Sequence, residues 1–223
     1  MDGTRKVSKP KASRAEDGLR DRHQTEERML AAAQHLFAER GFHAVSVRDI
    51  AAEVGVSHAL VHRYLGSKEE ILTAVMKRNT GPVLGVARAA GSAREAVPAM
   101  FRELRVSRPD YLKLLARMGM DRVPFAAVRP EFPAYALLIE LLKADAAERG
   151  RELPDPRVLA ASLTALVIGW SVTEDWLLTA SGLDDVDARA SEASLGLILQ
   201  SMVDSGSPPV IPGEAADEAA KST

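Results

Sequence analysis

The segment VSVRDIAAEVGVSHALVHRYLGSK, residues 45–68, decides the fold of this chain. It contains Ser46, Ser57 and Ser67 about ten residues apart, each followed by a short run with apolar residues at helical spacing. Serine is a preferred N-cap because its hydroxyl accepts a hydrogen bond from a free N–H group at the start of a helix. The spacing therefore predicts three successive helices. Gly55, between the first two, supplies a turn in which a positive φ costs little.

Two short helices joined by a glycine turn are the pattern of a helix-turn-helix. Ile50, Ala51 and Val54 are the inward residues expected in the first helix, and Val61 is one in the second. The other face of the second helix is left free, and such a helix fits the major groove of DNA, where its N-terminal residues meet base edges. The residues expected on that free face are Ser57, His58, Ala59, His62 and Arg63.

Cationic side chains near the helix starts suit the phosphates on either side of such a groove. Arg48 follows the first cap and Lys68 follows the third, while the helix starts at Ser46 and Ser67 offer backbone N–H groups to anions. Ser67 and Glu70 also have the spacing of a capping box. The full set of residues predicted at the DNA is Ser46, Val47, Arg48, Ser57, His58, Ala59, His62, Arg63, Tyr64 and Lys68.

Together with the helix before it, this segment resembles the DNA-binding domain of the TetR family of bacterial regulators, over residues 25–78. The matching pieces, in chain order, are Ala33 with Leu36-Phe37, Gly41-Phe42, Val47–Ala51, Gly55–Ser57 and Ser67–Glu70. The chain departs from the usual pattern at Ala59-Leu60, where Gly-Thr is common, at His62, where Tyr is common, and at Leu65, where Phe is common. The resemblance implies an all-α protein with a helix-turn-helix head and a helical body that binds a small molecule and forms the dimer.

The rest of the chain also has helical periodicity, with no long stretch of the alternation that marks a strand. We expect a disordered basic arm over 1–24, the DNA-binding domain over 25–78 with Thr25 as its N-cap, a helical ligand-binding and dimerisation domain over 79–204, and a flexible tail over 205–223. Gly81-Pro82 is expected to mark a break after the fourth helix. Further helices are expected near 93–106, 109–120, 131–149, 155–180 and 184–204, with Asp155 and Asp184 among the candidate caps.

Charge is distributed unevenly along the 223 residues, although the net charge is only -2. Residues 1–80 hold 14 Lys and Arg against 11 Asp and Glu, and the remainder holds 15 against 20. A basic end on an acidic body suggests contact with a polyanion. The arm, with Arg5, Lys6, Lys9, Lys11, Arg14, Arg20 and Arg22, either follows the DNA or is a solubilising leader, and both readings stay open.

The chain has no cysteine, which excludes disulfides and cysteine-ligated metals. Its N-terminus lacks the apolar core of a secretory signal. The uncharged stretch from Val158 to Thr173 has 16 residues, fewer than the roughly 20 of a spanning helix, so a buried core helix is predicted there. We therefore expect a cytoplasmic protein without a membrane segment.

The sequence leaves two alternatives to a regulator open. His58 and His62 lie at i and i+4, the spacing of two metal ligands on a helix, but a zinc site needs a third ligand; a metal-dependent enzyme would use them. A helical adaptor that binds only proteins is the other alternative. Glu174 and Asp175 are adjacent, so they point about 100° apart on a helix and do not converge as a catalytic pair. No metal, cofactor or enzymatic activity is expected.

The body is expected to enclose the effector and to form the dimer. By resemblance, a pocket is placed around Met100, Phe101, Leu104, Tyr111, Leu115, Phe132, Tyr135 and Trp170. The last two helices, apolar or rich in small residues, are predicted to form the dimer surface. The partners implied are a pseudo-palindromic double-stranded DNA operator, a small-molecule effector and a second copy of the chain, and the function implied is that of a ligand-released repressor.

Overall fold

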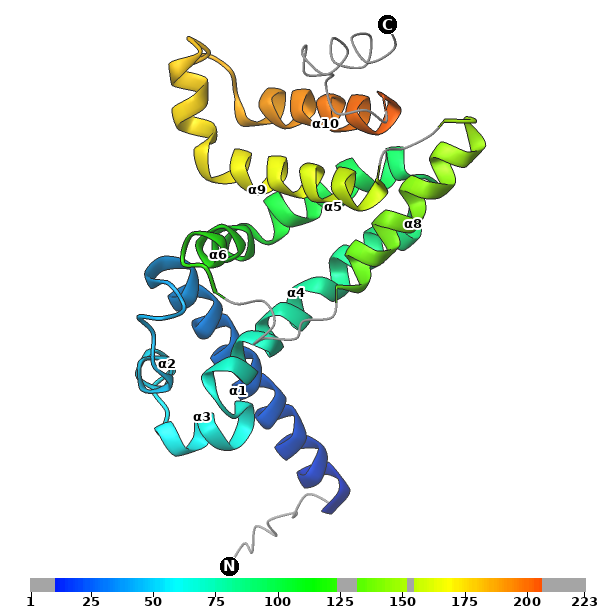
Figure 1. Ribbon diagram of the computed structural model, residues 1–223. Coiled ribbons are helices and arrows are strands. Elements are labelled where there is room, and N and C mark those ends of the chain that lie inside the picture. Colours follow the sequence, from blue (N-terminus) through cyan, green and yellow to red (C-terminus); the bar gives the residue numbers. More distant parts are fainter. Residues whose placement is uncertain (1–10, 124–131, 152–154, 206–223) are drawn as a thin grey trace, which may run out of the picture. The chain divides into compact units, whose positions relative to one another are not determined.

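A computed structural model describes residues 11–123, 132–151 and 155–205, with only the backbone described over 11–18. Within these ranges the protein is all helical and has no strand, as the sequence predicts (Figure 1). The helices are α1 (Lys11–Arg40), α2 (Val47–Val54), α3 (His58–Leu65), α4 (Lys68–Ala89), α5 (Ala93–Ser107), α6 (Pro109–Met120), α8 (Pro133–Glu148), α9 (Pro156–Ala180) and α10 (Ala188–Ser205).

The chain divides into two compact units. The described residues of the first, the head unit, are 11–78 and 117–123, and those of the second, the body unit, are 79–116, 132–151 and 155–205. The expected boundary at residue 79 puts residues 117–123 in the body, whereas the structure groups this end of α6 with the head. Helices α4 and α6 therefore each contribute residues to both units.

The core of the head unit forms where α1 packs against α2 and α3 and is closed by the first half of α4. Its buried residues recur every three or four positions, as expected for helices with one inward face. They are Met29, Ala33, Leu36, Phe37, Ile50, Ala51, Val61, Ile71, Leu72, Val75 and Met76, joined by Met118 and Val123.

Helix α1 begins at Lys11 and not at Thr25, so the prediction of a disordered arm over 1–24 is wrong from Lys11 onward. Thr25 is an interior residue, and its hydroxyl donates to the Asp21 carbonyl at 2.8 Å instead of capping the helix. The extra turns have no apolar stripe, which is why periodicity missed them. Extending a helix that packing already holds adds one hydrogen bond per residue without a new nucleation step. Residues 1–10 lie outside the described ranges.

Helix α4 continues through Gly81-Pro82 to Ala89, so the predicted break there is wrong. The second half of the helix is held by its own contacts in the body unit, where Val83 and Ala87 are buried. Arg108 Nη1 donates to the buried Asn79 Oδ1 at 3.2 Å, which adds a polar tie between α4 and the start of α6. These contacts offset the backbone hydrogen bond that a proline removes inside a helix.

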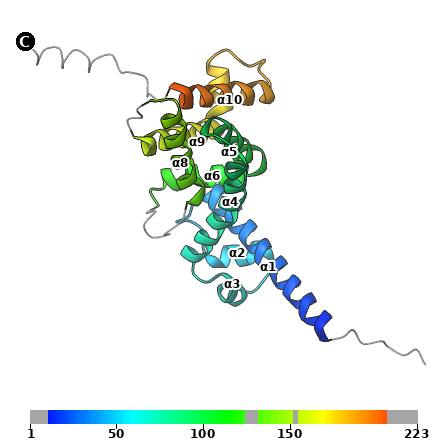
Figure 2. The ribbon, with the colours of Figure 1, turned by 90° about the vertical axis from the view of Figure 1, so that its right-hand side faces the viewer.

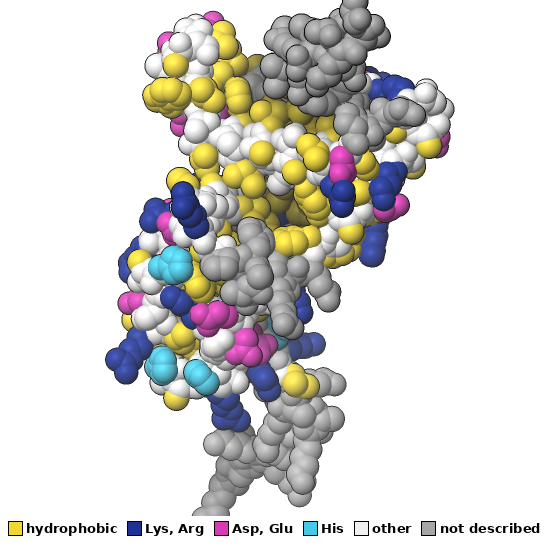
Figure 3. All heavy atoms as spheres, in the orientation of Figure 1, with side chains coloured by type: hydrophobic (Ala, Val, Ile, Leu, Met, Phe, Trp, Pro, Cys, Tyr) yellow, Lys and Arg dark blue, Asp and Glu magenta, His cyan; other side chains and the backbone are white. Residues whose placement is uncertain are grey.

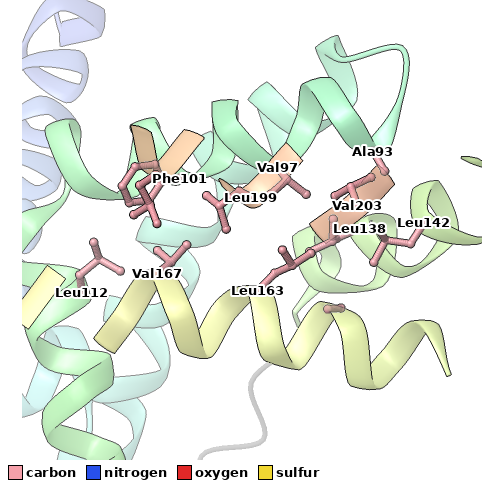
Figure 4. Packing of buried hydrophobic residues seen from close by; sticks show 12 residues of the cluster. Ala93, Val97, Phe101, Leu112, Leu138, Leu142, Leu163, Val167, Leu199 and Val203 are labelled. Atoms are coloured by element: carbon pink, nitrogen blue, oxygen red, sulfur yellow. The ribbon is translucent and has the colours of Figure 1, made fainter. Parts of the chain in front are cut away.

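The body unit has one main core, built from α5, α6, α8, α9 and α10 (Figure 4). Phe101 and Val97 of α5 meet Leu199 of α10, while Leu163 and Val167 of α9 point toward them. The predicted helices of this region are all present. Asp155 caps α9 as expected, but the cap of α10 is Asp187, which accepts from the Ala190 N–H at 2.8 Å, and not Asp184.

Helix α9 is buried on one side only, which corrects the prediction of a core helix. Ala160, Leu163 and Val167 are its buried residues, whereas Val172 and Trp176 are 48% and 71% exposed. Among the helices described, it alone is long and apolar enough to cross a membrane by length and composition. Within the described part of the chain, a long apolar face of α9 is therefore left uncovered.

Glu174, on the side of α9 that faces α5 and α10, is held by polar contacts. Arg105 Nη1 lies 2.5 Å from Glu174 Oε2, and the buried Ser191 hydroxyl donates to Oε1 of the same carboxylate. Burial raises the pKa of Glu174, but the hydrogen bonds from Arg105 and Ser191 outweigh it, so the net shift is downward. Asp175 is exposed, and the two acids do not share a site.

Candidate nucleic-acid interface

A reciprocal capping box starts α2. The Ser46 N–H donates to Asp49 Oδ2 at 2.7 Å, and the Asp49 N–H donates to Ser46 Oγ at 3.3 Å. Hydrogen bonds from the Ser46 side chain and backbone lower the pKa of Asp49, so this carboxylate stays ionised at neutral pH. The box fixes the first turn of α2, where Val47 is half-buried and the Arg48 side chain is exposed. Arg48 is therefore available to an external anion.

A left-handed turn at Gly55 ends α2. Gly55 has φ 75° and ψ 37°, and its N–H donates to Ala51 O at 3.0 Å and Ala52 O at 3.2 Å. The Val56 N–H also donates to Ala51 O, at 3.0 Å, so the last carbonyls of α2 are satisfied before the chain reverses. This turn sets the angle at which α3 crosses α2.

Helix α3 presents a polar face to solvent, on the side that the sequence predicts to be free. Ser57 caps it by accepting from the Leu60 N–H at 3.2 Å, and Val61 is fully buried beneath it. The exposed residues of this face are His58, Ala59, His62 and Arg63. Figure 3 shows histidine and cationic side chains scattered over the part of the surface that carries α2 and α3.

The two histidines of α3 lie close to each other, with ring centroids 6.4 Å apart. Among the residues described, no third His, Cys, Asp or Glu joins them in a group that could hold a metal ion. Two imidazoles alone leave a tetrahedral site incomplete. Their exposed ring nitrogens can instead exchange hydrogen bonds with an external partner.

A second capping box starts α4 after the turn at Gly66. The Ser67 N–H donates to Glu70 Oε2 at 2.7 Å, and the Glu70 N–H donates to Ser67 Oγ at 3.2 Å. The neighbouring Lys68 is engaged inside the head, because its ammonium donates to the Phe42 carbonyl at 3.0 Å and lies 4.4 Å from the Phe42 ring centroid. An ammonium has three donors, so Lys68 retains capacity for a phosphate beside this internal role.

Arg22, one of the arm residues for which the sequence leaves DNA contact open, lies at this surface. Its guanidinium lies 5.0 Å from the centroid of the Tyr64 ring on α3, and it also pairs with Glu26 at 3.7 Å. The sequence signal was the basic character of the N-terminal segment, but the contact depends on α1 being helical there. Tyr64, predicted at the DNA, is half-buried at the end of the exposed face.

Comparison with known proteins agrees with this geometry. The pattern of the family described as "Bacterial regulatory proteins, tetR family" matches residues 29–75. The HTH-type transcriptional repressor Rv3405c of Mycobacterium tuberculosis is 35% identical over 160 residues, which cover 71% of this chain and 78% of that protein. The chain belongs to the TetR family. It is a transcriptional regulator with a helix-turn-helix DNA-binding head.

Solved structures show the same TetR fold beyond the head. A putative transcriptional regulator, SCO4942 of Streptomyces coelicolor, aligns with a TM-score of 0.60 at 23% identity, over 80% of this chain and 97% of its own. A HlyIIR mutant protein with residues 169–186 replaced by a linker aligns with a TM-score of 0.61 at 19% identity, over 85% of this chain and 100% of its own. These likenesses extend the shared fold into the body unit.

The residues predicted to line an effector pocket are only partly gathered in the body unit. Phe101 is in the main core, and Met100, Leu104, Tyr135 and Trp170 pack against that core as half-buried neighbours. Tyr111 is buried in α6, and this burial raises its pKa to about 12. Leu115 and Phe132 are half-buried outside the main core.

A groove of about 370 Å³ lies between α5 and α10, and Phe101 is the one predicted pocket residue that lines it. Its apolar lining comes from Pro98, Ala193 and Leu197, and Arg102 stands at its edge, paired with Glu192 at 3.3 Å. This groove has no signal in the sequence, because it depends on how α10 lies against α5.

Proposed function

We propose that this TetR-family regulator is a repressor that binds a pseudo-palindromic operator as a homodimer and is released when a small molecule binds its body. The exposed polar face of α3, held by two capped helix starts and a rigid glycine turn, is the observation that carries the proposal. A recognition helix must present base-reading side chains without rearranging, and the three structural elements around α3 provide that rigidity.

The residues on this surface have two roles in the proposal. His58 and His62, with Arg63, read base edges in the major groove, where imidazole and guanidinium donors suit the acceptors of guanine. Arg48 and the backbone N–H groups at the start of α2 contact the phosphates beside it. A base-edge contact gives sequence preference, whereas a phosphate contact strengthens binding to every sequence.

Homodimerisation follows from the unpartnered face of α9. Along this face, small or apolar exposed residues lie at helical spacing, with gaps of one, three, four or seven positions: Val158, Ala161, Ser162, Ala165, Val172 and Trp176. Small side chains allow two helices to approach closely, and a long apolar patch on a soluble protein marks an association surface. Exposed Ile198 of α10 extends the apolar surface. A two-fold dimer would carry two recognition helices, which fit the two halves of an inverted repeat.

Release by a small molecule is supported by the groove between α5 and α10. Its volume of about 370 Å³ falls in the range of small-molecule sites, and its apolar lining with a charged edge is typical of them. A ligand can weaken DNA binding only if it binds the DNA-free state more tightly than the DNA-bound state. Filling the groove with Ala193→Leu should leave operator binding intact and make the protein insensitive to its effector.

Selection of bound sequences from a random DNA pool, read by sequencing, tests the central proposal. Enrichment of an inverted repeat is expected, and the selected operator should then shift as a complex of two chains per duplex. Binding that is only salt-sensitive and shows no preferred sequence would overturn the proposal of a sequence-reading dimer. A screen of small molecules for loss of that shift tests the effector, with Ala193→Leu as the insensitive control.

A further inference from the structure

The two histidines of α3 differ in their position along the helix. His58 is its first residue, whereas His62 lies in its last turn, followed by Arg63. The start of a helix carries partial positive charge and its end partial negative charge, so a cation is disfavoured at the first position and stabilised at the second. The ring centroids are 6.4 Å apart, so a charge on one imidazole opposes a charge on the other. A proton taken up by this pair is therefore better placed on His62.

A carboxylate of α4 adds to this preference for positive charge at the end of α3. Hydrogen bonds from the Ser67 backbone and side chain lower the pKa of Glu70, and the charge of His62 lowers it further. Glu70 is therefore ionised at neutral pH. The attraction is mutual, so the carboxylate favours the protonated form of the imidazole. Both side chains are exposed, so this attraction is weak and leaves the protonation of His62 responsive to an external anion.

Other charged groups around α3 are largely engaged within the head. Those on α2 and on the adjoining turns of α1 and α4 are Arg22, His23, Glu26, Glu27, Arg28, Arg48, Asp49, Glu53, Lys68 and Glu69. Glu26 pairs with Arg22 at 3.7 Å. Arg28 and Lys68 donate to backbone carbonyls, and Asp49 caps α2. Because these groups already have partners, the phosphates of a bound duplex would be the main new charge near His62.

We propose that His62 takes up a proton when α3 enters the major groove, so that each subunit binds the operator with His62 as an imidazolium. Figures 1 and 2 show α3 at the outer edge of the head unit, with α1 and α2 on its inner side. His62 lies on the exposed face of this helix, where a docked duplex brings phosphate oxygens and guanine acceptors. A neutral imidazole offers them one N–H donor, whereas an imidazolium offers two donors and a positive charge. This inference rests on the proposed function, since it needs α3 in the groove.

Proton uptake makes operator binding depend on pH with a fixed sign. A histidine side chain changes its charge between about pH 5 and pH 8. The complex holds the His62 proton to a higher pH than the free protein does, so affinity falls as the pH rises through this window. Below the window the free protein is protonated as well, and affinity levels off. The regulator would then hold its operator more tightly as its surroundings become more acidic.

The test measures affinity for the selected operator from pH 6.0 to pH 8.5 at fixed salt concentration, using the full chain. A nearby opposite charge favours the charged form of a group by about one pH unit or more. For one proton in each of two subunits, this corresponds to a loss of affinity of roughly 50-fold over the range. Calorimetric titrations in two buffers of different ionisation enthalpy count the protons directly, and about one proton per dimer should be taken up at pH 7.

Variants of the two histidines separate His62 from the rest of the head. His62→Gln keeps an N–H donor but gains no charge, so its operator affinity should be nearly independent of pH. His62→Arg carries a permanent charge and should bind at pH 8.5 as tightly as at pH 6.0. His58→Gln is the matched control on the same helix and should keep the wild-type pH dependence.

Two results would overturn this inference and leave the proposed function standing. One is a wild-type pH dependence that survives in His62→Gln. The other is equal wild-type affinity at pH 6.0 and pH 8.5 with the inverted repeat still selected. If the wild-type chain selects no sequence at either pH, the proposed function itself fails.

Discussion

The exposed faces of α3 and α9 differ in chemistry, and each difference indicates a different partner. The free face of α3 carries His58, His62 and Arg63, which donate hydrogen bonds and favour a polyanion. The free face of α9 carries Val172 and Trp176, whose exposure to water is unfavourable unless another apolar surface covers them. We therefore propose that the first face binds DNA and that the second binds a second copy of the chain.

The helix-turn-helix and the body also differ in the contacts that stabilise them. The helix-turn-helix is fixed by local hydrogen bonds, such as those that the Ser46, Ser57 and Ser67 hydroxyls accept from the N–H groups three positions on, and by the turn at Gly55. The body is held by contacts between residues distant in sequence, such as Arg105 with Glu174. Perturbing one face at a time should therefore separate DNA reading from dimer formation.

Charging the α9 face should have the largest effect. Ala165→Glu places a carboxylate in the middle of the exposed stripe, where dimerisation would bury it without a partner, so we expect monomers. A monomer binds only one half-site of the operator. Loss of the linked second half-site contact should weaken operator binding by about 100-fold or more. Light scattering and operator titration measure the two consequences.

Ala144→Glu on the exposed side of α8 is the matched control, with the same chemical change away from α9 and α10. It should remain dimeric and bind the operator as the wild type does. If Ala165→Glu is dimeric as well, the dimer surface lies elsewhere, and the assignment of dimerisation to the α9 face is wrong.

The next largest effect should come from Gly66, at the turn between α3 and α4. Its φ of 79° and ψ of -141° lie in a region that is nearly restricted to glycine, and a Cβ there would overlap the Glu70 carboxylate that caps α4. Gly66→Ala should therefore lower the free energy of unfolding by about 2 kcal/mol. Gly55→Ala meets open space and only a left-handed backbone, which costs about 1 kcal/mol. Urea unfolding compares them, and equal losses would contradict the overlap with Glu70.

The helix-turn-helix was predictable because its signals are local. The caps Ser46, Ser57 and Ser67, the glycine turn and the buried Val61 all fall where the spacing places them. The departures have physical reasons as well. Helix α1 begins at Lys11, ahead of its apolar stripe, because a helix that packing already holds extends without a new nucleation step. Helix α4 passes Pro82 because packing on both sides of the proline maintains the helix.

The body site was less predictable because it depends on how distant helices meet. Aromatic residues such as Tyr111 and Trp170 are placed in or against buried surfaces by their hydrophobicity, but this property does not tell a pocket wall from a core position. The groove beside Phe101 arises from the packing of α10 on α5. One-sided burial of α9 was missed for the same reason, since a helix that is apolar all round has no period to mark its free face.

A smaller effect should separate the two kinds of DNA contact within the head. Arg48→Ala should weaken binding to all sequences by about tenfold near physiological salt and lower the salt slope by about 0.9. His58→Ala should leave the slope unchanged and reduce the preference for one base position by about 1 kcal/mol. Repeating the random-pool selection with each variant measures the base preference directly. A flattened preference in Arg48→Ala, or a changed slope in His58→Ala, would reverse these roles.

The smallest expected effect concerns acid sensitivity of the α4 capping box. Hydrogen bonds from the Ser67 backbone and side chain lower the pKa of Glu70 below its ordinary value of 4.5. The folded head therefore releases this proton more readily than the unfolded chain does. The resulting stabilisation is fully present above the unfolded value and is lost as the pH falls through the lower folded value.

Glu70→Gln keeps a side chain that can accept the Ser67 N–H bond, because glutamine also serves at this position of a capping box. Its stability at pH 7 should stay close to that of the wild type, while its urea midpoint should fall less steeply as the pH drops below 4.5. Glu69→Gln, one position away and without a bond to Ser67, should keep the wild-type slope. If the urea midpoints of all three proteins fall equally with pH, protonation of Glu70 has no measurable effect on stability. The rigidity around α3 would then come from its buried contacts alone.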